Sequence, residues 1–551
     1  MTKGNGETAV SEKKPLAQKM LDGIERVGNK VPHPVLMFLY LIIIVVALSH
    51  ILYLMGVSVT EDIAVPVEVQ TEGAYYTDST EPGQLLPTEP YDAQFEIKQQ
   101  TIAIKSLLSV EGLRFIFTSF VSNFASFSVV AVILVAMVGV GVAEESGLMG
   151  ALIRKTVKVT PRQLITFILV FVGVLSSVAT DAGYLILIPL GAIAFLSLGR
   201  HPLAGVAAAF GGVSAVFAVN ILIAPIDGML TEITNEAINL AGGQPITIVA
   251  NYYFAVASTI ILSIVAAVIT DRIIEPRLGA YHPSDDAPAE EVQDAKAIAA
   301  ETKGLRYALY AFLGMLALVL LLTLPSGAPL RDPATGAIIG NTPFMASLIF
   351  IITLFFLLAG IGYGLGAKTI TSSADVIKGV TKTFASLAGL IFMLLMISQF
   401  IAFFNFSNMP QVVAIWMADA LEQANIGALP LLVGFILVIM LLNFIIPNVI
   451  PKWAIFAPIF IPVFLRLNVA PQTVLAAYRV GDSPTNIITP LMVYLPFVLT
   501  VVQRYQKDAG IGTVIALMLP YTLVISIVWI LLFVVWFALG IPLGPGYPVG
   551  F

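Results

Sequence analysis

The sequence predicts an all-α polytopic membrane protein with about nine transmembrane helices and two opposed re-entrant hairpins, arranged as an inverted repeat. Three observations predict this class: the composition, the recurrence of long apolar runs, and the basic residues between those runs. Of the 551 residues, 58% are hydrophobic and 11% are charged, whereas a soluble domain is about half apolar and about a quarter charged. The apolar runs are about 20 residues long, which suits a helix that crosses a bilayer, and they lack the alternation of barrel strands.

The composition also excludes several kinds of function. The chain has no cysteine, so it has no disulfide, no thiolate metal site and no cysteine nucleophile. Its four histidines are scattered at loops and span ends, without the spacing of a metal site. The sequence contains neither a P-loop motif nor a basic tract, which argues against ATP-driven pumping and nucleic-acid binding. We therefore expect neither an enzyme nor a protein with a bound cofactor.

Basic residues near the ends of the apolar runs predict the orientation, because cytoplasmic loops are enriched in Lys and Arg. The basic segment 1–33 is therefore expected in the cytoplasm, and no signal-peptide cleavage pattern follows it. The first span is expected at 34–57, followed by a polar, acid-rich external loop at 58–110.

The other segments follow from the same rule. In chain order we expect a first repeat at 111–270, a cytoplasmic loop at 271–304, a two-span scaffold at 305–364, a cytoplasmic loop at 365–383, a second repeat at 384–540 and an external tail at 541–551.

Each repeat contains a predicted hairpin, formed by two short apolar runs on either side of a polar turn. The first hairpin, at 163–199, has the turn SSVATDAGY and basic residues at both outer ends, so it should enter from the cytoplasm. The second, at 428–466, has the turn PNVIPK and should enter from outside. Non-helical backbone at membrane depth is tolerated only inside protein or beside a watery cavity, so both turns should lie there.

Two pairs of similar motifs indicate the repeat. GYLILIP at 183–189 corresponds to KWAIFAP at 452–458, and VNILIAP at 219–225 corresponds to TNIITP at 485–490. Each copy has a span, a surface helix, a hairpin, a broken span and a last span. Three crossings is an odd number, so the copies have opposite orientations, as in secondary transporters with a site between the repeats.

The broken span of the second repeat holds the polar stretch VGDSPTNIITP at 480–490, in which Pro484 and Pro490 interrupt the helix. Freed carbonyls can bind a cation, and a helix start can bind an anion. We interpret Arg479 as the ligand of a substrate carboxylate and Asp482 as a group that handles a proton or orients the site. The alternative is a structural Arg479–Asp482 ion pair beside proline kinks.

Asp181, in the first hairpin turn, is a second acid at membrane depth. It is interpreted as a coupling or substrate residue, either a Na⁺ ligand or a proton carrier, and the alternative is a cap for the helix that starts at Gly183. Asn220 and Asn486 are equivalent in the repeat and are candidate Na⁺ ligands; the alternative is that they satisfy freed backbone groups. Hydroxyl residues that could support the site are Ser176, Ser177, Thr180, Ser483 and Thr485.

Three further residues are candidates for contact with the substrate. Trp453, at the second hairpin turn, could stack on an aromatic ring, although tryptophan more often marks a membrane interface. Lys452 beside it is a weaker candidate. Asn405, in FFNFSN, lines the cavity or marks the end of a span.

The stretch AAYRVGDSPTNIITPLMVYLPFVLTVVQRYQKDAGIGTVIALMLPY resembles the p-aminobenzoyl-glutamate transporter (AbgT) family, as do PKWAIFAPIFIPVF, TDAGYLILIPL, QFIAFFNFSN and NKVPHPVLMFLY. The resemblance covers nearly the whole chain. It implies nine spans with two opposed hairpins, and a homodimer with a solvated bowl in the bacterial inner membrane. It also implies transport of p-aminobenzoyl-glutamate or export of sulfonamide antimetabolites, driven by a Na⁺ or H⁺ gradient. The family's site residues correspond to Asp181, Trp453, Pro471, Arg479, Asp482 and Pro490.

One departure concerns the substrate. Ile450 stands where the family usually has a serine, which removes a hydroxyl contact. We expect an ion-coupled antiporter or symporter of aromatic carboxylates, with the direction, the ion and the physiological substrate open. The alternatives are a carrier of dicarboxylates or short organic acids, in which Trp453 is incidental, and an intramembrane aspartyl protease.

Overall fold

The computed structural model describes residues 34–66, 95–178, 183–281, 295–340, 342–423 and 427–550. Eight helices in these ranges are long and apolar enough to cross a membrane, or nine if the bent pair α5–α6 forms one span. This confirms the predicted class, an all-α polytopic membrane protein with about nine spans. The sides from which the two hairpins enter the membrane stay a prediction.

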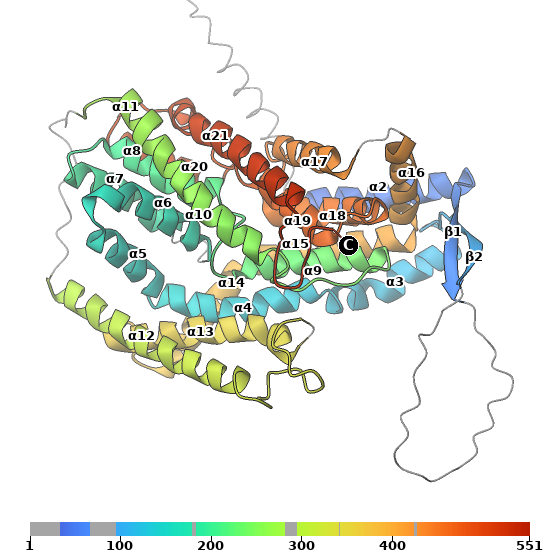
Figure 1. The fold of residues 1–551 in the computed structure, drawn as a ribbon, viewed down its shortest axis with the longest axis horizontal. Coiled ribbons are helices and arrows are strands. Elements are labelled where there is room, and N and C mark those ends of the chain that lie inside the picture. Colours follow the sequence, from blue (N-terminus) through green and yellow to red (C-terminus); the bar gives the residue numbers. More distant parts are fainter. Residues whose placement is uncertain are drawn as a thin grey trace, which may run out of the picture.

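The N-terminal region begins with α2 (Pro34–Leu54) and continues into two strands, β1 (Ser58–Pro66) and β2 (Phe95–Ala103). The strands pair antiparallel, with Ser58 opposite Ala103 and Pro66 opposite Phe95, and the hairpin projects from one end of the molecule (Figure 1). We predicted an external loop over 58–110; within it the structure shows these two paired strands, which the sequence pattern did not predict. Their acids and low apolar content suggested a loop, whereas the pairing joins residues distant in sequence.

The first repeat consists of a series of helices separated by turns and interruptions. Its helices are α3 (Val110–Ala125), α4 (Ser128–Glu145), α5 (Leu148–Val159), α6 (Ile165–Leu175), α7 (Ile188–Ser197), α8 (Pro202–Phe210), α9 (Pro225–Leu240), α10 (Tyr252–Ile269) and α11 (Glu275–Leu278). Helix α5 meets α6 at a bend of 120°. The predicted hairpin corresponds to α6 and α7. The predicted break near 220 lies in the non-helical segment between the π-helical turn Gly211–Ala215, which follows α8, and the start of α9.

The scaffold pair is α12 (Ala295–Thr323) and α13 (Pro343–Ala367), which lie side by side next to α4 (Figure 1). Helix α12 begins ten residues before the predicted span. A short helix, α14 (Ser373–Ser386), occupies part of the segment expected as a loop.

The second repeat has the same order of elements. Its helices are α15 (Ala388–Phe406), α16 (Met409–Gln423), α17 (Ala428–Leu442), α18 (Val449–Arg466), α19 (Pro471–Asp482), α20 (Leu495–Gln503) and α21 (Ile511–Ala538). The second hairpin turn is shorter than expected, because α18 already begins at Val449. Asn448 caps this helix by accepting a hydrogen bond from the Ile450 N–H, and proline is tolerated in a first helical turn.

The two broken spans lie at the centre of the protein. Every residue of α8 and every residue of α19 is buried. The polar side chains of α19 are therefore surrounded by protein rather than lipid, which is where charged groups at membrane depth are found.

Candidate functional site

The interruptions of the two broken spans contact each other through the backbone N–H and carbonyl of Ala218. The Ala218 N–H donates to Ser483 Oγ over 3.0 Å, and the Ala218 carbonyl accepts from Arg479 Nη1 over 2.8 Å. These partners come from opposite repeats, and each helix has ended near the contact, so backbone groups are free to bond there. The structure thus joins the two unwound segments at one point in the interior.

Arg479 forms an ion pair with Asp227 of the first repeat. Arg479 Nη1 lies 2.6 Å from Asp227 Oδ1, and Asp227 Oδ2 accepts from the N–H of Ala224, which caps the start of α9. The Arg479 side chain is 2% exposed and that of Asp227 is 15% exposed. The alternative Arg479–Asp482 pair is therefore wrong, because each of the two has a different ionic partner in three dimensions.

The guanidinium of Arg479 uses only part of its donor capacity. Both of its hydrogen bonds are made by Nη1, while Nε is buried and has no hydrogen-bond partner among the described residues. An arginine has five N–H donors, and its Nε–Nη2 edge matches the two oxygens of a carboxylate. This edge makes no hydrogen bond within the described residues, which leaves a built donor pair for an anion.

Asp482 is paired with a lysine from the second hairpin. Lys452 Nζ lies 2.8 Å from Asp482 Oδ1, and neither side chain is exposed. Lys452 Nζ also donates to Asn443 Oδ1. A fully buried ion pair loses the hydration of both charges, so the additional hydrogen bond helps to keep it stable.

Asn443 organises the turn of the second hairpin. Its Nδ2 lies 2.8 Å from the Asp482 carbonyl, 2.8 Å from Thr485 Oγ1 and 2.6 Å from Asn486 Oδ1. The amide therefore ties the turn after α17 to the unwound segment after α19. In this conformation the Asn486 oxygen is already an acceptor for a protein donor.

Asn220 makes the corresponding contacts in the first repeat. Its Nδ2 donates to the Val174 carbonyl over 3.1 Å and to Ser177 Oγ over 3.0 Å, and its Oδ1 accepts from the Leu222 N–H over 2.9 Å. Ser177–Asn220 and Asn443–Asn486 are both 43 residues apart. Equivalent contacts between a hairpin turn and a broken span thus occur in both repeats. Both amides satisfy freed groups here, and their role as Na⁺ ligands stays a prediction.

Trp453 is completely buried in this conformation. Its Nε1 donates to Thr234 Oγ1 on α9 over 2.9 Å, and its ring lies 4.4 Å from that of Tyr478. A substrate ring can stack on Trp453 only if these neighbours separate.

The remaining predicted residues are less closely connected. Pro471 is buried as the first residue of α19, and Pro490 lies in the interruption before α20. Asn405 lies on α15, and its buried Oδ1 accepts no hydrogen bond from any described residue. Ile450 is buried in the first turn of α18. Asp181 and Thr180 lie outside the described residues.

Sequence reasoning missed Asp227 and Asn443. Asp227 is the third residue of a helix that begins with Pro225, a position where an acid commonly caps a helix. Asn443 stands where the repeat places Ser177, so a longer alignment of the two copies could have found it.

A cavity of about 210 Å³ lies between α9 and α13. Its lining includes Thr231 and Glu232 from α9 and Met345 and Ile349 from α13. Glu232 accepts a hydrogen bond of 2.6 Å from Ser128 of α4. The lining does not include Arg479 or Asp227, but it includes Gly228, the residue after Asp227.

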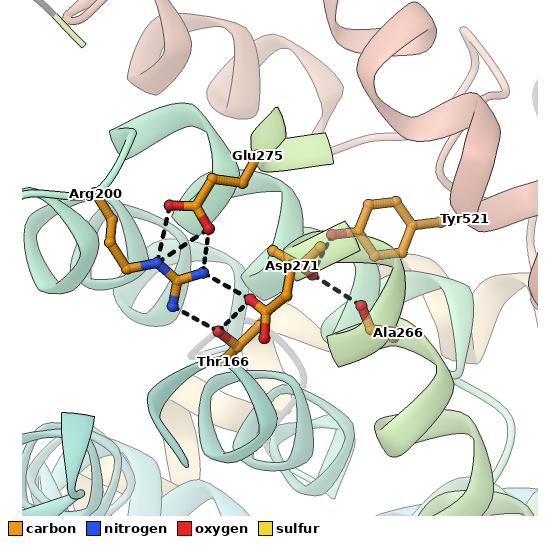
Figure 2. Close-up of polar contacts among 7 residues, drawn as sticks. Thr166, Arg200, Ala266, Asp271, Glu275 and Tyr521 are labelled. Carbon is orange, nitrogen blue, oxygen red and sulfur yellow. Dashed lines mark hydrogen bonds and ion pairs between the residues drawn. The ribbon is translucent and has the colours of Figure 1, made fainter. Parts of the chain in front are cut away.

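A second ionic network surrounds Arg200, in the turn between α7 and α8 (Figure 2). Arg200 Nε lies 2.9 Å and 3.1 Å from the two oxygens of Glu275, Nη2 lies 2.6 Å from Asp271, and Nη1 donates to Thr166 over 2.8 Å. Partial burial lowers the pKa of Arg200, but hydrogen bonds to Glu275 and Asp271 outweigh it and raise the pKa above its ordinary value. The network connects α6, the α7–α8 turn and the segment 271–275, which follows α10 and ends with the first residue of α11.

The same chain is similar to transport proteins of known family. Residues 19–551 match the model of the family described as AbgT putative transporter family. The chain is 34% identical, over 532 residues, to the p-aminobenzoyl-glutamate transport protein of Escherichia coli K12, and the match covers 96% of this chain and 97% of the relative.

Two solved structures are similar over almost the whole chain. The Alcanivorax borkumensis YdaH transporter, described as having an unusual topology, has 35% identity and a TM-score of 0.81, covering 93% of this chain and all of its own. Neisseria gonorrhoeae MtrF, described as illuminating a class of antimetabolite efflux pumps, has 37% identity and a TM-score of 0.81, covering 96% of this chain and all of its own.

Proposed function

The chain belongs to the AbgT putative transporter family, a family of transporters rather than enzymes, and we propose that it is an ion-coupled secondary transporter of p-aminobenzoyl-glutamate-like aromatic carboxylates. Export of sulfonamide antimetabolites is part of the same proposal, supported by the similarity to an efflux pump. The observation that carries the proposal is the Nε–Nη2 edge of buried Arg479, which makes no hydrogen bond within the described residues and lies between two broken spans.

A carboxylate at this edge would receive two parallel N–H donors, the strongest geometry available to an arginine. The start of α9 lies nearby through the Asp227 contact, and a helix start favours negative charge. The substrate carboxylate would therefore bind where donors from both repeats meet. Trp453 is proposed to contact the aromatic ring in a conformation in which its neighbours have moved.

Ion coupling is proposed to involve Asp181, Asp482 and the polar groups around them, with Na⁺ or H⁺ as the ion. Ser483, Asn220 and Asn486 supply oxygens close to the two interruptions. Na⁺ prefers such oxygen ligands, whereas a buried carboxyl can carry a proton. The protein is further proposed to be a homodimer in the bacterial inner membrane, with its N-terminus in the cytoplasm.

One observation favours a second candidate substrate class. Trp453 is buried and hydrogen-bonded to Thr234, so it contributes no open aromatic surface here. A carrier of dicarboxylates or short organic acids needs Arg479 but not Trp453. Two observations argue against the protease alternative: the family is one of transporters, and Asp482 is paired with Lys452 rather than with a second aspartate.

Counterflow of labelled p-aminobenzoyl-glutamate in liposomes tests the proposal. The wild-type protein should exchange the label, and Arg479→Lys should reduce exchange at least about tenfold, because a lysine cannot offer the paired donors of the guanidinium. Arg306→Lys, at an exposed position on α12, is the matched control and should behave as wild type. No exchange by the wild type would refute the substrate, and Arg479→Lys with full exchange would refute the site.

A competition experiment distinguishes the two substrate classes. If succinate blocks exchange as well as unlabelled substrate does, and Trp453→Ala transports normally, the dicarboxylate carrier is favoured. Loss of exchange in a folded Trp453→Ala protein, without competition by succinate, supports the aromatic carboxylate.

A further inference from the structure

Asp227 holds two parts of the site in place at once. Its Oδ1 lies 2.6 Å from Arg479 Nη1, and its Oδ2 accepts from the N–H of Ala224 over 2.8 Å. One carboxylate therefore connects the arginine of the second broken span to the start of α9 in the first. By binding Nη1, it leaves the Nε–Nη2 edge of Arg479 without a partner among the described residues.

The buried charges of the broken spans are already balanced. Arg479 is paired with Asp227, and Lys452 is paired with Asp482. Arg479 is the one charged side chain within ion-pair distance of Asp227 in the described part of the chain. Other charged residues on α9 and on the helices packed against it are Glu232 and Glu236 on α9, Glu144 and Glu145 on α4, Lys452 and Arg466 on α18, and Asp482 on α19.

A substrate carboxylate at the open edge would place two carboxylates around one guanidinium. The site would then carry one excess negative charge in an environment that screens charge poorly, which opposes binding. A monovalent cation that binds together with the substrate, either as a proton on a carboxylate or as Na⁺ between oxygens, removes this excess. Without Asp227, Arg479 alone would balance the charge of the carboxylate bound to it.

We propose that Asp227 is a positioning and coupling residue, which orients Arg479 through Nη1 and requires one monovalent cation to bind with the substrate carboxylate at Arg479. The inference rests on the proposed function, because it assumes an anionic substrate at Arg479. It adds the residue that links substrate binding to the cation and predicts that the two bind together. Because binding linkage is reciprocal, the substrate also tightens the binding of the cation.

The experiment measures the Kd of p-aminobenzoyl-glutamate for the purified full-length protein, first against Na⁺ concentration at fixed pH and then against pH at fixed Na⁺. For the wild type, a tenfold rise in one of the two cations should lower the Kd up to about tenfold, the limit for one linked cation. Asp227→Asn should bind at least about tenfold more tightly than wild type at the lowest cation concentration, and its Kd should not depend on the cation. Glu111→Gln, an exposed acid on α3, is the control and should retain the wild-type dependence.

Asp227→Glu keeps the charge and covers the case in which Asp227→Asn does not fold. It should retain the cation dependence with a weaker overall affinity. Cation-dependent binding by folded Asp227→Asn, loss of its binding altogether, or cation-independent binding by Asp227→Glu would each overturn the inference. If Asp227 had only a structural role, its variants would change the stability of the protein, but the Kd would still depend on the cation concentration.

Failure of the inference can be told from failure of the proposed function. Wild-type protein that binds p-aminobenzoyl-glutamate independently of both cations overturns the role of Asp227 and leaves the substrate assignment intact. Wild-type protein that does not bind this compound overturns the substrate assignment, and the linkage is then measured with succinate by the same series.

Discussion

At position 443, one asparagine side chain connects three parts of the site. It accepts from Lys452, donates to the Asp482 carbonyl and contacts Asn486. All of these groups are buried, so none of them can form a hydrogen bond with water instead if the amide is lost. The polar residues of the hairpin turns therefore support the charged residues as well as the backbone.

Asn443→Ala should lower the stability of the protein by about 1–3 kcal/mol, because it leaves a buried ammonium and a buried amide without this partner. The measurement is the melting temperature of the purified protein in detergent. Asn405→Ala is the matched control, since the Asn405 Oδ1 is buried and has no hydrogen-bond partner within the part of the chain that the structure describes, and it should cost clearly less. An equal loss in the two variants would contradict the role given to Asn443.

At the scale of elements, close contact of short helices positions the broken spans. Helix α19 packs against α17 so closely that a Cβ at Gly481 would lie 2.8 Å from the Ile436 carbonyl oxygen. This contact fixes the position of the backbone that carries the neighbouring residues Arg479 and Asp482. The absence of a side chain at position 481 thus fixes how near the hairpin arm approaches the broken span.

Gly481→Ala should therefore destabilise the protein by about 1–3 kcal/mol through overpacking, and it should reduce transport by displacing Arg479 and Asp482. Gly434→Ala, on α17, is the control, because a Cβ there meets nothing within 4 Å. It should be neutral or stabilise by up to about 1 kcal/mol. Melting temperature and counterflow measure the two effects. If Gly481→Ala is well tolerated, α19 is not packed against α17 as closely as the 2.8 Å approach implies.

The Arg200 network is a second contact between elements (Figure 2). Arg200→Gln should lower stability by about 1–3 kcal/mol, because Glu275 and Asp271 lose their shared, partly buried cation. Arg272→Gln, an exposed neighbour, should have little effect. Thermal melting compares the two, and equal melting temperatures would mean that the network does not stabilise the contact of the α7–α8 turn with residues 271–275.

At the scale of the whole molecule, the two repeats meet through their irregular segments. Ala218 of the first repeat contacts Arg479 and Ser483 of the second, and Asp227 contacts Arg479. An inverted repeat places two such segments at the same depth, where each can satisfy the other. Helix α13, a candidate membrane span, lies between the loop before it and the loop before α14, so these two loops should lie on opposite sides of the membrane.

Single cysteines test this orientation, because the chain has none of its own. Ala334→Cys, in the exposed turn between α12 and α13, should react with a membrane-impermeant maleimide in intact cells. Ala374→Cys, exposed at the start of α14, should react only after the membrane is permeabilised. The reverse pattern would place the N-terminus outside, and labelling of both in intact cells would contradict the predicted span between them.

Much of the architecture follows from the sequence by itself. Long apolar runs, basic loops and two matched motifs predicted the class of fold, the approximate positions of the spans, the two hairpins and both broken spans. Such predictions are possible because bilayer thickness and backbone hydrogen bonding leave few alternatives. The same patterns identified Arg479, Asp482 and Lys452 as charges at membrane depth. The paired strands β1 and β2 did not follow, since their hydrogen bonds join distant segments.

Only the tertiary structure decided the partners of these charges. Spacing along α19 suggested that Arg479 pairs with Asp482, but Arg479 contacts Asp227 and Asp482 contacts Lys452. Helical periodicity describes which side chains share a face of one helix, whereas an ion pair between repeats depends on how two broken helices are placed in space. Local sequence therefore determined which residues are polar inside the membrane, and packing determined which of them neutralise one another.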